Sequence, residues 1–342
     1  MDLLILFGGK SGEHDVSCLS AQSVLNNITK EKYSIIKVGI TKEGNWLKTD
    51  ATPEEIASGK WLELENTPAI LSPDPMHHGL LADGKVINVD VIFPVMHGDF
   101  CEDGCIQGLF ELSGIPYVGP GVLASSAGMD KSATKLFAES AGVPQADWVV
   151  LNAPYNNEMI NIIENKFSYP VFIKPCNAGS SLGVSKVSSS KELEEAIKEA
   201  AKVDSKILCE EFIDGHEVEC AVLGNSDPKA SCVGEVISSN EFYDYNAKYI
   251  DNASIINIPA TLPDETSENI RKYAVAVYRA LGCKGLSRVD FFVHKKTGAI
   301  YFNEINTLPG FTKISMYPKL WDNDGISYSC LIDKLIEFAL NN

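Results

Sequence analysis

Residues 284–318 read KGLSRVDFFVHKKTGAIYFNEINTLPGFTKISMYP. Two runs rich in apolar and aromatic residues, 287–293 and 299–305, flank the polar connector HKKTG. This pattern predicts two antiparallel strands joined as a hairpin, because apolar runs separated by a short polar segment with glycine are typical of such pairs.

Three polar side chains interrupt these strands, namely Asp290, Glu304 and Asn306. Glu304 and Asn306 are two positions apart and share one face, which Asp290 joins if the strand register allows. Mg²⁺ prefers one or two carboxylates together with substrate phosphate oxygens, so the trio predicts a nucleoside triphosphate site. The alternative, which this segment alone leaves open, is the solvated face of an edge hairpin.

Composition narrows the class of protein. The 342 residues are 45% apolar and 22% charged, which is typical of globular proteins with a substantial core. The 29 Lys and Arg against 46 Asp and Glu give a formal charge of −17. This acidic balance argues against a general nucleic-acid binder and against a partner at an anionic membrane surface.

The nine cysteines are scattered and odd in number, which predicts buried thiols in a reducing compartment rather than a disulfide framework. The chain opens directly into a predicted strand, and no apolar run reaches membrane-spanning length. We therefore expect a soluble cytoplasmic protein.

The N-terminal part alternates strands and helices, as α/β domains do. Strands are predicted at 3–7 and 33–40, a helix at 16–28, and a loop-like region with four prolines at 49–84. The turn GGKSGEH, between the first strand and the helix, matches neither the P-loop nor the dinucleotide-binding pattern.

A buried strand at 89–95 ends at a polar, glycine-bearing loop, where open α/β sheets place their ligands. His97, Glu102 and Asp103 are therefore site candidates, although for any one of them alone a surface loop is the more typical setting. A helix at 106–113 and a strand at 115–118 are expected to close the first domain.

A helix predicted at 125–142 carries Lys131 and Lys135 on one side. The next chemical stretch, KPCNAGSSLGVSKV (174–187), predicts two strands joined by a Gly/Ser loop. Such a loop can fold its backbone N–H groups and hydroxyls over phosphates, whereas a plain flexible hairpin is the simpler alternative.

Two further segments are unusual. Glu210 and Glu211 lie in a predicted strand, where an unpaired buried carboxylate is costly, so they are expected to face a ligand or solvent. The stretch NEFYDYNAKYIDN (240–252) has no clear period and contains Lys248 and Tyr249, which favours a lid or binding loop. Helices at 190–201, 268–281 and 327–339 complete the pattern.

Eight motifs, in this order, resemble those of the D-alanine–D-alanine ligase family of the ATP-grasp fold. They are GGKSGEHDVS, VMHGDFCEDGCIQG, MDKSATK, YPVFIKPCNAGSSLGVSKV, EEFIDGHE, FYDYNAKY, LSRVDFF and NEINTLPGFTKISMYP. The resemblance implies an α/β (α+β) protein of three domains, an N-terminal Rossmann-like parallel α/β domain (1–119), a central ATP-grasp subdomain (120–211) and a catalytic domain (212–342).

The resemblance also implies a reaction. The carboxylate of one D-alanine attacks the γ-phosphate of ATP to give an acyl phosphate, and the amine of a second D-alanine displaces phosphate. The dipeptide is a peptidoglycan precursor, so the implied host is a bacterium. ATP and Mg²⁺ (or Mn²⁺) are the implied substrate and cofactor, and a homodimer built through the first domain is the implied assembly.

The family's ATP-binding roles fall on eight residues, Lys131, Lys174, Ser181, Glu210, Glu211, Ile213, Glu217 and Lys248. The lysines would contact phosphates, Lys248 the transferring one, and Ser181 would donate from its backbone. Glu210 would accept from the adenine amino group, the backbone of Glu211 and Ile213 would read the ring edge, and Glu217 would bind ribose.

The remaining roles concern the amino acids and the metal. Glu13 would hold the ammonium of the first D-alanine in a set with Ser180 and Tyr249, and His97 would lie near its carboxylate. Arg288 and the Gly310 N–H would stabilise the tetrahedral oxyanion, and Ser315 would bind the second carboxylate. The metal would be held by Asp290, Glu304 and Asn306.

Two positions depart from the family pattern or bear on specificity. Cys101 stands where the family usually has glycine. Met316 is apolar where relatives that use D-lactate or D-serine commonly carry a polar residue, which favours D-alanine as second substrate. One pocket residue typically contributes only about 1–3 kcal/mol of discrimination between substrates, so a D-alanine–D-serine ligase is the alternative.

A non-catalytic ATP-binding regulator is the alternative from another class of protein, although such a protein would not need Arg288.

Overall fold

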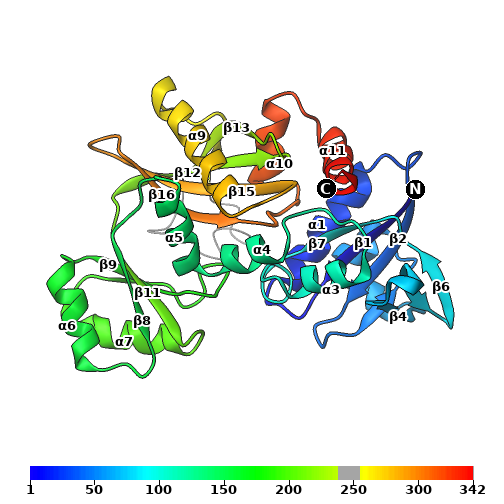
Figure 1. Ribbon diagram of the computed structural model, residues 1–342, viewed down its shortest axis with the longest axis horizontal. Helices are drawn as coiled ribbons and strands as arrows, with labels where there is room; N and C mark the ends of the chain where they lie inside the picture. The colour runs from blue at the N-terminus through cyan, green and yellow to red at the C-terminus, as the bar shows by residue number, and fades with distance from the viewer. Residues whose placement is uncertain (238–254, 342) are drawn as a thin grey trace.

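The computed structural model describes residues 1–237 and 255–341, and three β-sheets form its framework (Figure 1). The predicted lid segment at 240–252, with Lys248 and Tyr249, lies outside the described residues. The helices and strands have the following residue ranges in the structure.

The N-terminal sheet has seven strands in the order β6-β5-β4-β3-β2-β1-β7. They are β1 (Asp2–Gly8), β2 (Ser34–Ile40), β3 (Trp46–Lys48), β4 (Thr67–Leu71), β5 (Gly79–Ala82), β6 (Lys85–Asn88) and β7 (Val91–Met96). The expected parallel part is β2-β1-β7, and the remaining pairs are antiparallel. Helices α1 (His14–Asn27) and α3 (Cys105–Ser113) follow β1 and β7, as the sequence predicts.

The loop-like interpretation of residues 49–84 was wrong. This region contains α2 (Pro53–Ala57), the 3₁₀ turns η1 (Lys60–Glu63) and η2 (Pro75–His77), and the strands β4 and β5. Prolines begin two of these elements, where a missing N–H costs nothing. The Thr52 hydroxyl accepts from the Glu55 N–H at 3.2 Å, and the Glu55 carboxylate accepts from the Thr52 N–H at 2.8 Å. This reciprocal capping box fixes the start of α2.

The prediction of a strand at 115–118 was also wrong. Ile92 makes two backbone hydrogen bonds there, donating to the Pro116 carbonyl at 2.8 Å and accepting from the Val118 N–H at 2.9 Å. These bonds form a single parallel bridge between Ile92 and Tyr117, and the pairing does not extend into a strand.

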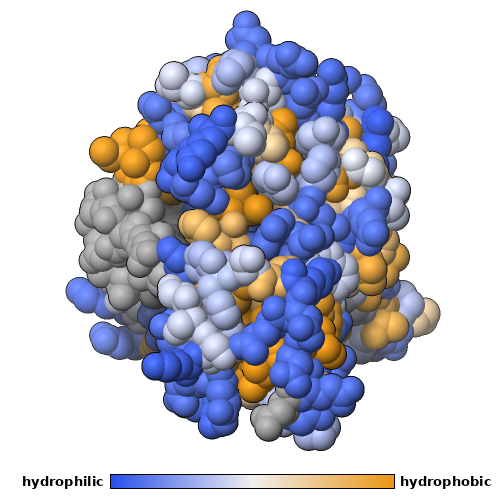
Figure 2. All heavy atoms as spheres, turned by 90° about the vertical axis from the view of Figure 1, so that its left-hand side faces the viewer, coloured by the Kyte–Doolittle hydropathy of each residue, from blue (hydrophilic) through white to orange (hydrophobic). Residues whose placement is uncertain are grey.

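The second sheet is antiparallel, with the order β10-β9-β11-β8. Its strands are β8 (Trp148–Asn152), β9 (Val171–Pro175), β10 (Ser185–Val187) and β11 (Lys206–Glu211), and helices α6 (Asn157–Lys166) and α7 (Ser190–Ala201) cover one face (Figure 1). The loop between β9 and β10 is the predicted Gly/Ser flap. The side of the molecule that carries this layer is covered mainly by hydrophilic side chains, with apolar groups exposed in small separate patches (Figure 2).

The third sheet contains the opening hairpin and has the order β14-β13-β12-β15-β16, all antiparallel. Its strands are β12 (Gly215–Leu223), β13 (Lys229–Ile237), β14 (Ile255–Asn257), β15 (Leu286–His294) and β16 (Ile300–Asn306). Helix α9 (Asp264–Ala280) packs along β12, β13 and β15 (Figure 1).

The single helix predicted at 125–142 is two helices, α4 (Val122–Met129) and α5 (Lys131–Ser140). The chain breaks at Asp130, whose backbone is extended and whose carboxylate accepts from the N–H groups of Ser132 at 2.9 Å and Ala133 at 3.2 Å. Asp130 is therefore the N-cap of α5, a role that aspartate fills well. Both helices share an apolar core with the third sheet, whereas the predicted domain boundaries group them with the second.

The chain ends in α10 (Met316–Asn323) and α11 (Tyr328–Leu340), which share one apolar core with β1, α1 and β7. The Asp333 carboxylate on α11 accepts from the Tyr33 hydroxyl at 2.8 Å and from the Lys32 ammonium at 2.5 Å. Figure 1 shows both termini on the same side of the molecule. The last helix thus packs on the first domain.

A helix that crosses a membrane must be both long and apolar. Within residues 1–237 and 255–341, no helix combines the length and apolar character that crossing a membrane requires.

Gly39 on β2 tests the packing of the first core. A Cβ at this position would lie 2.5 Å from Cη2 of Trp61 and 2.9 Å from Cε2 of Phe7. Because both rings are fully buried, Gly39→Ala is expected to destabilise the protein by about 1–3 kcal/mol. The measurement is the apparent melting temperature at a fixed scan rate.

The matched control is Gly108→Ala in α3, where a Cβ would meet nothing within 4 Å. Alanine favours helix over glycine by up to about 1 kcal/mol, so this variant should be neutral or slightly stabilised. Equal melting temperatures for Gly39→Ala and the parent protein would contradict the packing described.

Candidate active site

The predicted hairpin is present, and its register pairs Asp290 with Glu304 and Arg288 with Asn306. Residues opposite each other in an antiparallel pair lie on the same face, as do residues two apart on one strand. The four side chains therefore share one face of β15 and β16, which is the register that the predicted trio requires.

Arg288 is held between two carboxylates on this face. Its Nε and Nη2 donate to Oδ1 and Oδ2 of Asp290 at 2.8 and 2.7 Å, and Nε lies 2.9 Å from Oε2 of Glu219. Burial alone would lower the pKa of Arg288, but the charges of Asp290 and Glu219 raise it well above its usual value. The guanidinium is therefore a permanent cation at this face.

Glu219 is a partner that the sequence interpretation missed. It lies on β12 directly opposite Asp290 in the register and is 3% exposed. A signal was available, because Glu217 and Glu219 are two apart in EVECAVL (217–223), an apolar run typical of a strand, so their side chains point to one face.

The metal ligands predicted from the sequence are Asp290, Glu304 and Asn306. Within the described residues, no group of three or more His, Cys, Asp or Glu side chains could hold a metal ion. The predicted set has two carboxylates and one amide, and the amide oxygen of Asn306 accepts from the Leu308 N–H at 3.0 Å. Hard oxygen donors fit a cation that takes its other ligands from phosphates, and a carboxylate bound to arginine keeps lone pairs for a second partner.

A cavity of about 470 Å³ lies at this face. Fifteen of the predicted site residues line it: Glu13, Lys131, Lys174, Ser180, Ser181, Glu210, Glu211, Ile213, Glu217, Arg288, Glu304, Asn306, Gly310, Ser315 and Met316. Asp290 and His97 are buried, at 1% and 3% exposure, and do not line it.

The flap at one end of the cavity is joined to the N-terminal domain. The Ser180 hydroxyl donates to Oε1 of Glu13, the residue at the N-cap position of α1. A Cβ on Gly179 would lie 3.0 Å from the same oxygen, so a larger residue would crowd this contact. Ser180 and Ser181 both have left-handed backbones, with φ of 50° and 58°. Serine rarely adopts this conformation, and consecutive turned N–H groups can form an anion-binding nest.

Two lysines lie beside the flap. The Lys131 ammonium, at the start of α5, donates to the Ala178 carbonyl at 2.5 Å. The Lys174 ammonium on β9 lies 2.5 Å from Oε2 of Glu210. Burial lowers the pKa of Lys131. Burial also acts to lower the pKa of Lys174, but the charge and hydrogen bond of Glu210 together with the charges of Glu304 and Glu217 raise it overall. Both lysines can present positive charge to phosphates.

Of the two settings expected for Glu210, a ligand or solvent, the structure shows the side chain at the cavity and largely out of solvent. The residue is 4% exposed, and its carboxylate contacts the fully buried Lys135 and the partly buried Lys174. Burial would raise the pKa of Glu210, but these cations lower it to about 2. Glu211 differs, because its Oε1 accepts from the Asp147 N–H at 3.0 Å.

Lys135 received no predicted role, although its position gave a signal. It follows Lys131 by one helical turn and therefore lies on the same face of α5.

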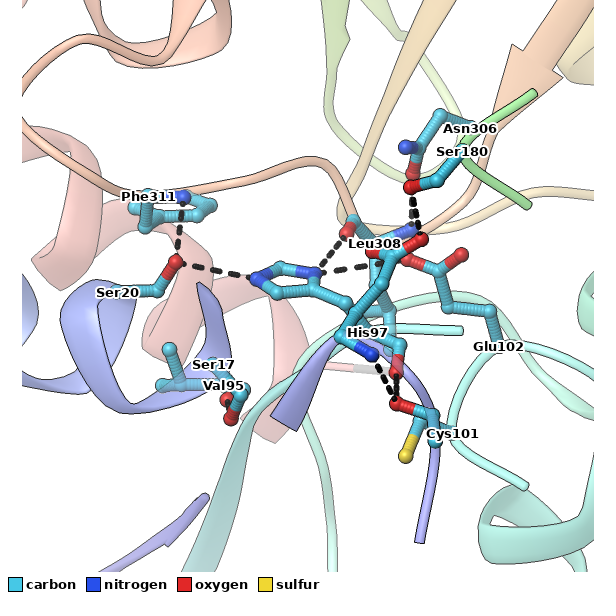
Figure 3. A network of polar contacts seen from close by, with 12 residues as sticks. Ser17, Ser20, Val95, His97, Cys101, Glu102, Ser180, Asn306, Leu308 and Phe311 are labelled. Atoms are coloured by element: carbon cyan, nitrogen blue, oxygen red, sulfur yellow. Dashed lines mark hydrogen bonds and ion pairs between the residues drawn. The ribbon is translucent and has the colours of Figure 1, made fainter. Parts of the chain in front are cut away.

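His97 links the N-terminal domain to the loop after β16 (Figure 3). Its Nδ1 lies 3.0 Å from the Leu308 carbonyl and its Nε2 lies 3.1 Å from the Ser20 hydroxyl, which accepts from the Phe311 N–H at 3.3 Å. All three bonds are satisfied when Nδ1 donates and Nε2 accepts. His97 thus holds the loop that carries Gly310, and its predicted contact with a substrate stays a prediction.

Glu102 lines the cavity beside His97, with Oε1 3.6 Å from Nδ1. Burial raises the pKa of Glu102 to about 7, against the lowering effect of His97. Burial acts to lower the pKa of His97, but Glu102, Glu13 and the Leu308 carbonyl together raise it, so the net direction is upward.

The loop that ends the hairpin stretch is closed on itself. The Ser315 hydroxyl accepts from the Thr312 N–H at 3.0 Å and lies 2.7 Å from the Thr312 hydroxyl. A Cβ on Gly310 would lie 2.9 Å from the Ser315 hydroxyl oxygen. Met316 packs over Gly234 of β13, where a Cβ would lie 2.8 Å from its sulfur.

Comparison with known proteins gives the family. The models of the D-ala D-ala ligase N-terminus and C-terminus match residues 2–120 and 137–337. The chain belongs to the D-ala D-ala ligase family.

Curated relatives within the family include the D-alanine–D-alanine ligases of Acetivibrio thermocellus and Ruminiclostridium cellulolyticum. Both are 54% identical to the chain. The match with the first relative covers 99% of the chain and 95% of the relative. The match with the second covers 98% of the chain and 94% of the relative.

Similar solved structures include the VanG D-Ala:D-Ser ligase from Enterococcus faecalis, at TM-score 0.93 and 40% identity over 99% of both chains. Another is the D-alanine–D-alanine ligase from Coxiella burnetii, at TM-score 0.87 and 33% identity, covering 100% of this chain and 95% of that one. The predicted α/β ATP-grasp fold is thereby confirmed.

The raised pKa of Glu102 makes stability depend on pH. A carboxyl whose pKa is higher in the folded state stabilises the fold fully below about pH 4.5, and this contribution is lost as pH rises through about 7. Glu102→Gln does not titrate, so its stability relative to the parent protein should rise between pH 5 and pH 8, by as much as about 3 kcal/mol.

The measurement is the apparent melting temperature of both proteins across this pH range. Glu65→Gln, at an exposed position, is the control and should shift with the parent protein. A constant difference between Glu102→Gln and the parent protein would contradict the buried neutral carboxyl.

Proposed function

We propose that the chain catalyses the ATP-dependent ligation of two D-alanines to D-alanyl-D-alanine, through a D-alanyl phosphate, as a step in peptidoglycan precursor synthesis. The observation that carries the proposal is that one cavity is lined by two lysines, a largely buried arginine and carboxylate and amide oxygens. Relatives with 54% identity over nearly the whole chain are D-alanine–D-alanine ligases.

ATP would lie along β9, β11 and β12. Lys131, Lys174 and the Ser181 N–H would contact the phosphates, and Lys248 would reach the transferring phosphate. The adenine and ribose would be bound by Glu210, by the backbone of Glu211 and Ile213, and by Glu217. Phosphoryl transfer needs positioning and cancellation of charge more than covalent chemistry, which this set of groups supplies.

In the first step, a carboxylate oxygen of D-alanine forms a bond to the γ-phosphorus as the bond from that phosphorus to ADP breaks. Glu13 would hold the ammonium group of this D-alanine, with Ser180 and Tyr249 completing the set. The observed hydrogen bond from Ser180 to Glu13 supports the proposal, because it couples the flap over the phosphates to the amino-acid site.

In the second step, the neutral amine of another D-alanine attacks the acyl carbonyl, phosphate leaves, and the amine loses a proton. Arg288 and the Gly310 N–H would stabilise the oxyanion, and Ser315 would bind the incoming carboxylate. A buried cation and a fixed N–H do not need to reorganise as charge develops, which is the usual basis of such stabilisation. His97 would act by holding this loop, with Glu102 beside it.

Asp290, Glu304 and Asn306 would hold Mg²⁺ or Mn²⁺. The ion would neutralise the charge that builds up on the β- and γ-phosphate oxygens during transfer. Arg288 offsets only one of the three carboxylates on this face, Asp290, Glu219 and Glu304, so the remaining formal charge is negative and favours a cation.

D-serine is the second candidate for the incoming amino acid, favoured by the structural similarity to a D-Ala:D-Ser ligase at TM-score 0.93. Met316 is the residue that favours D-alanine. It lines the cavity with an apolar side chain packed on Gly234, which offers no hydrogen bond to a serine hydroxyl.

The cellular setting follows from the reaction. ATP and D-alanine are small cytoplasmic molecules, so the enzyme would act in the cytoplasm, and it would do so as a homodimer through the first domain. The three-domain division at 1–119, 120–211 and 212–342 belongs to the same proposal.

Product analysis tests the function directly. The chain is incubated with ATP, Mg²⁺ and equal amounts of D-alanine and D-serine, and dipeptides and phosphate are measured. We expect D-alanyl-D-alanine as the main product, with one phosphate released per dipeptide. A dominant D-alanyl-D-serine product would support the second candidate, and nucleotide binding without phosphate release would support a regulator.

Glu304→Gln tests the metal ligands. Losing one carboxylate should raise the Mg²⁺ concentration for half-maximal activity by at least about tenfold, because metal sites are sensitive even to changes beyond the direct ligands. Glu265→Gln at the exposed start of α9 is the control. Wild-type turnover by Glu304→Gln at limiting Mg²⁺ would exclude Glu304 as a ligand.

A further inference from the structure

Lys135 is a fully buried lysine that the proposed reaction does not use. It lies on α5 and is 1% exposed, and its ammonium contacts Oε1 of Glu210 on β11. Burying an ammonium is costly unless an opposite charge compensates it. A cost of this kind points to a role for the contact beyond filling space.

The contact completes a buried triad of charges. Lys135 contacts one oxygen of Glu210, and Lys174 contacts the other at 2.5 Å. Two cations on opposite oxygens fix the plane of the carboxylate, which a single contact would leave free to turn. Each oxygen keeps a lone pair for a further donor, and Glu210 itself lines the cavity.

The charges also keep Glu210 an acceptor. Its pKa is lowered to about 2, so at neutral pH the carboxylate cannot donate a hydrogen bond. An acceptor with a fixed plane favours a ring that presents an amino group and repels one that presents a carbonyl oxygen. Adenine and hypoxanthine differ in this way at one position of the ring.

We propose that Lys135 is a positioning residue for nucleotide recognition, which holds the Glu210 carboxylate so that the site prefers adenine over hypoxanthine. The inference rests on the proposed function, in which Glu210 accepts from the adenine amino group. Lys135 acts through Glu210 and touches no substrate itself.

A purely structural role is the competing explanation, because the contact also ties α5 to β11. The chain offers a matched control for that role. Lys206, at the start of β11, lies 2.8 Å from Asp130, the N-cap of α5. This pair joins the same two elements, and neither residue lines the cavity.

The experiment measures binding of ADP and inosine diphosphate in the presence of Mg²⁺, by calorimetry and without D-alanine. We expect the parent protein to prefer ADP and Lys135→Met to lose about tenfold of this preference, since one hydrogen bond to a charged group is at stake. Lys206→Met should keep the full preference, even if its melting temperature falls.

Glu210→Gln and the double variant show whether Lys135 acts through Glu210. Glu210→Gln should lose the preference, and adding Lys135→Met should change it no further, because two residues that act through one contact are not additive. Lys135→Arg keeps the positive charge but changes the shape of the side chain. This variant should retain more of the preference for ADP than Lys135→Met does. It also serves as the test if Lys135→Met does not fold.

Three outcomes overturn the inference: an unchanged preference in Lys135→Met, an equal loss in Lys206→Met, or additive losses in the double variant. They are distinct from failure of the proposed function. Absence of nucleotide binding by the parent protein would remove the ATP-dependent reaction, whereas dipeptide formation without any base preference would remove only the role of Lys135.

Discussion

The charges around the cavity have been taken out of water, and each is tolerated there because an opposite charge faces it. Arg288 lies between Asp290 and Glu219, and Glu210 lies between Lys135 and Lys174. Removing the partner of one of these charges would lower the free energy of unfolding by about 3–5 kcal/mol. The first group joins two neighbouring strands of one sheet, β12 and β15, and the second holds a helix of that sheet's core against another sheet. Pairing of buried charge therefore sets the position of the cavity walls.

The sequence predicted the hairpin and the shared face of its polar residues because strand periodicity is local. Placing Asp290, Glu304 and Asn306 on one face requires only the two-residue period of a strand and one pairing register. The missed or misjudged features depended on partners distant in sequence. Glu210 is buried because Lys135 arrives from a helix of another core, and residues 49–84 gain strands by pairing across the sheet edge. The break at Asp130 was readable, since aspartate before a lysine and a serine can cap a helix, but a continuous helical pattern concealed it.

The loop between β16 and α10 is held from two directions. Asn306 anchors its start through Leu308, and His97 and Ser20 of the N-terminal domain contact Leu308 and Phe311. The residues proposed to choose the second substrate, Ser315 and Met316, follow directly. In the proposed reaction, the position of these residues would therefore depend on how the first domain meets the last one as well as on the pocket residues themselves.

The apolar core shared by the first sheet and the last two helices has a consequence for how the protein is made. Leu3, Ile5 and Phe7 are fully buried in a core that also contains Leu331, Leu335 and Ile336. During synthesis the first strand leaves the ribosome about three hundred residues before the helix that covers it, at about 5–20 residues per second. For that interval this side of the first sheet is covered by α1 but lacks the last two helices of its core. The chain must therefore reach its last helix before the N-terminal domain is complete.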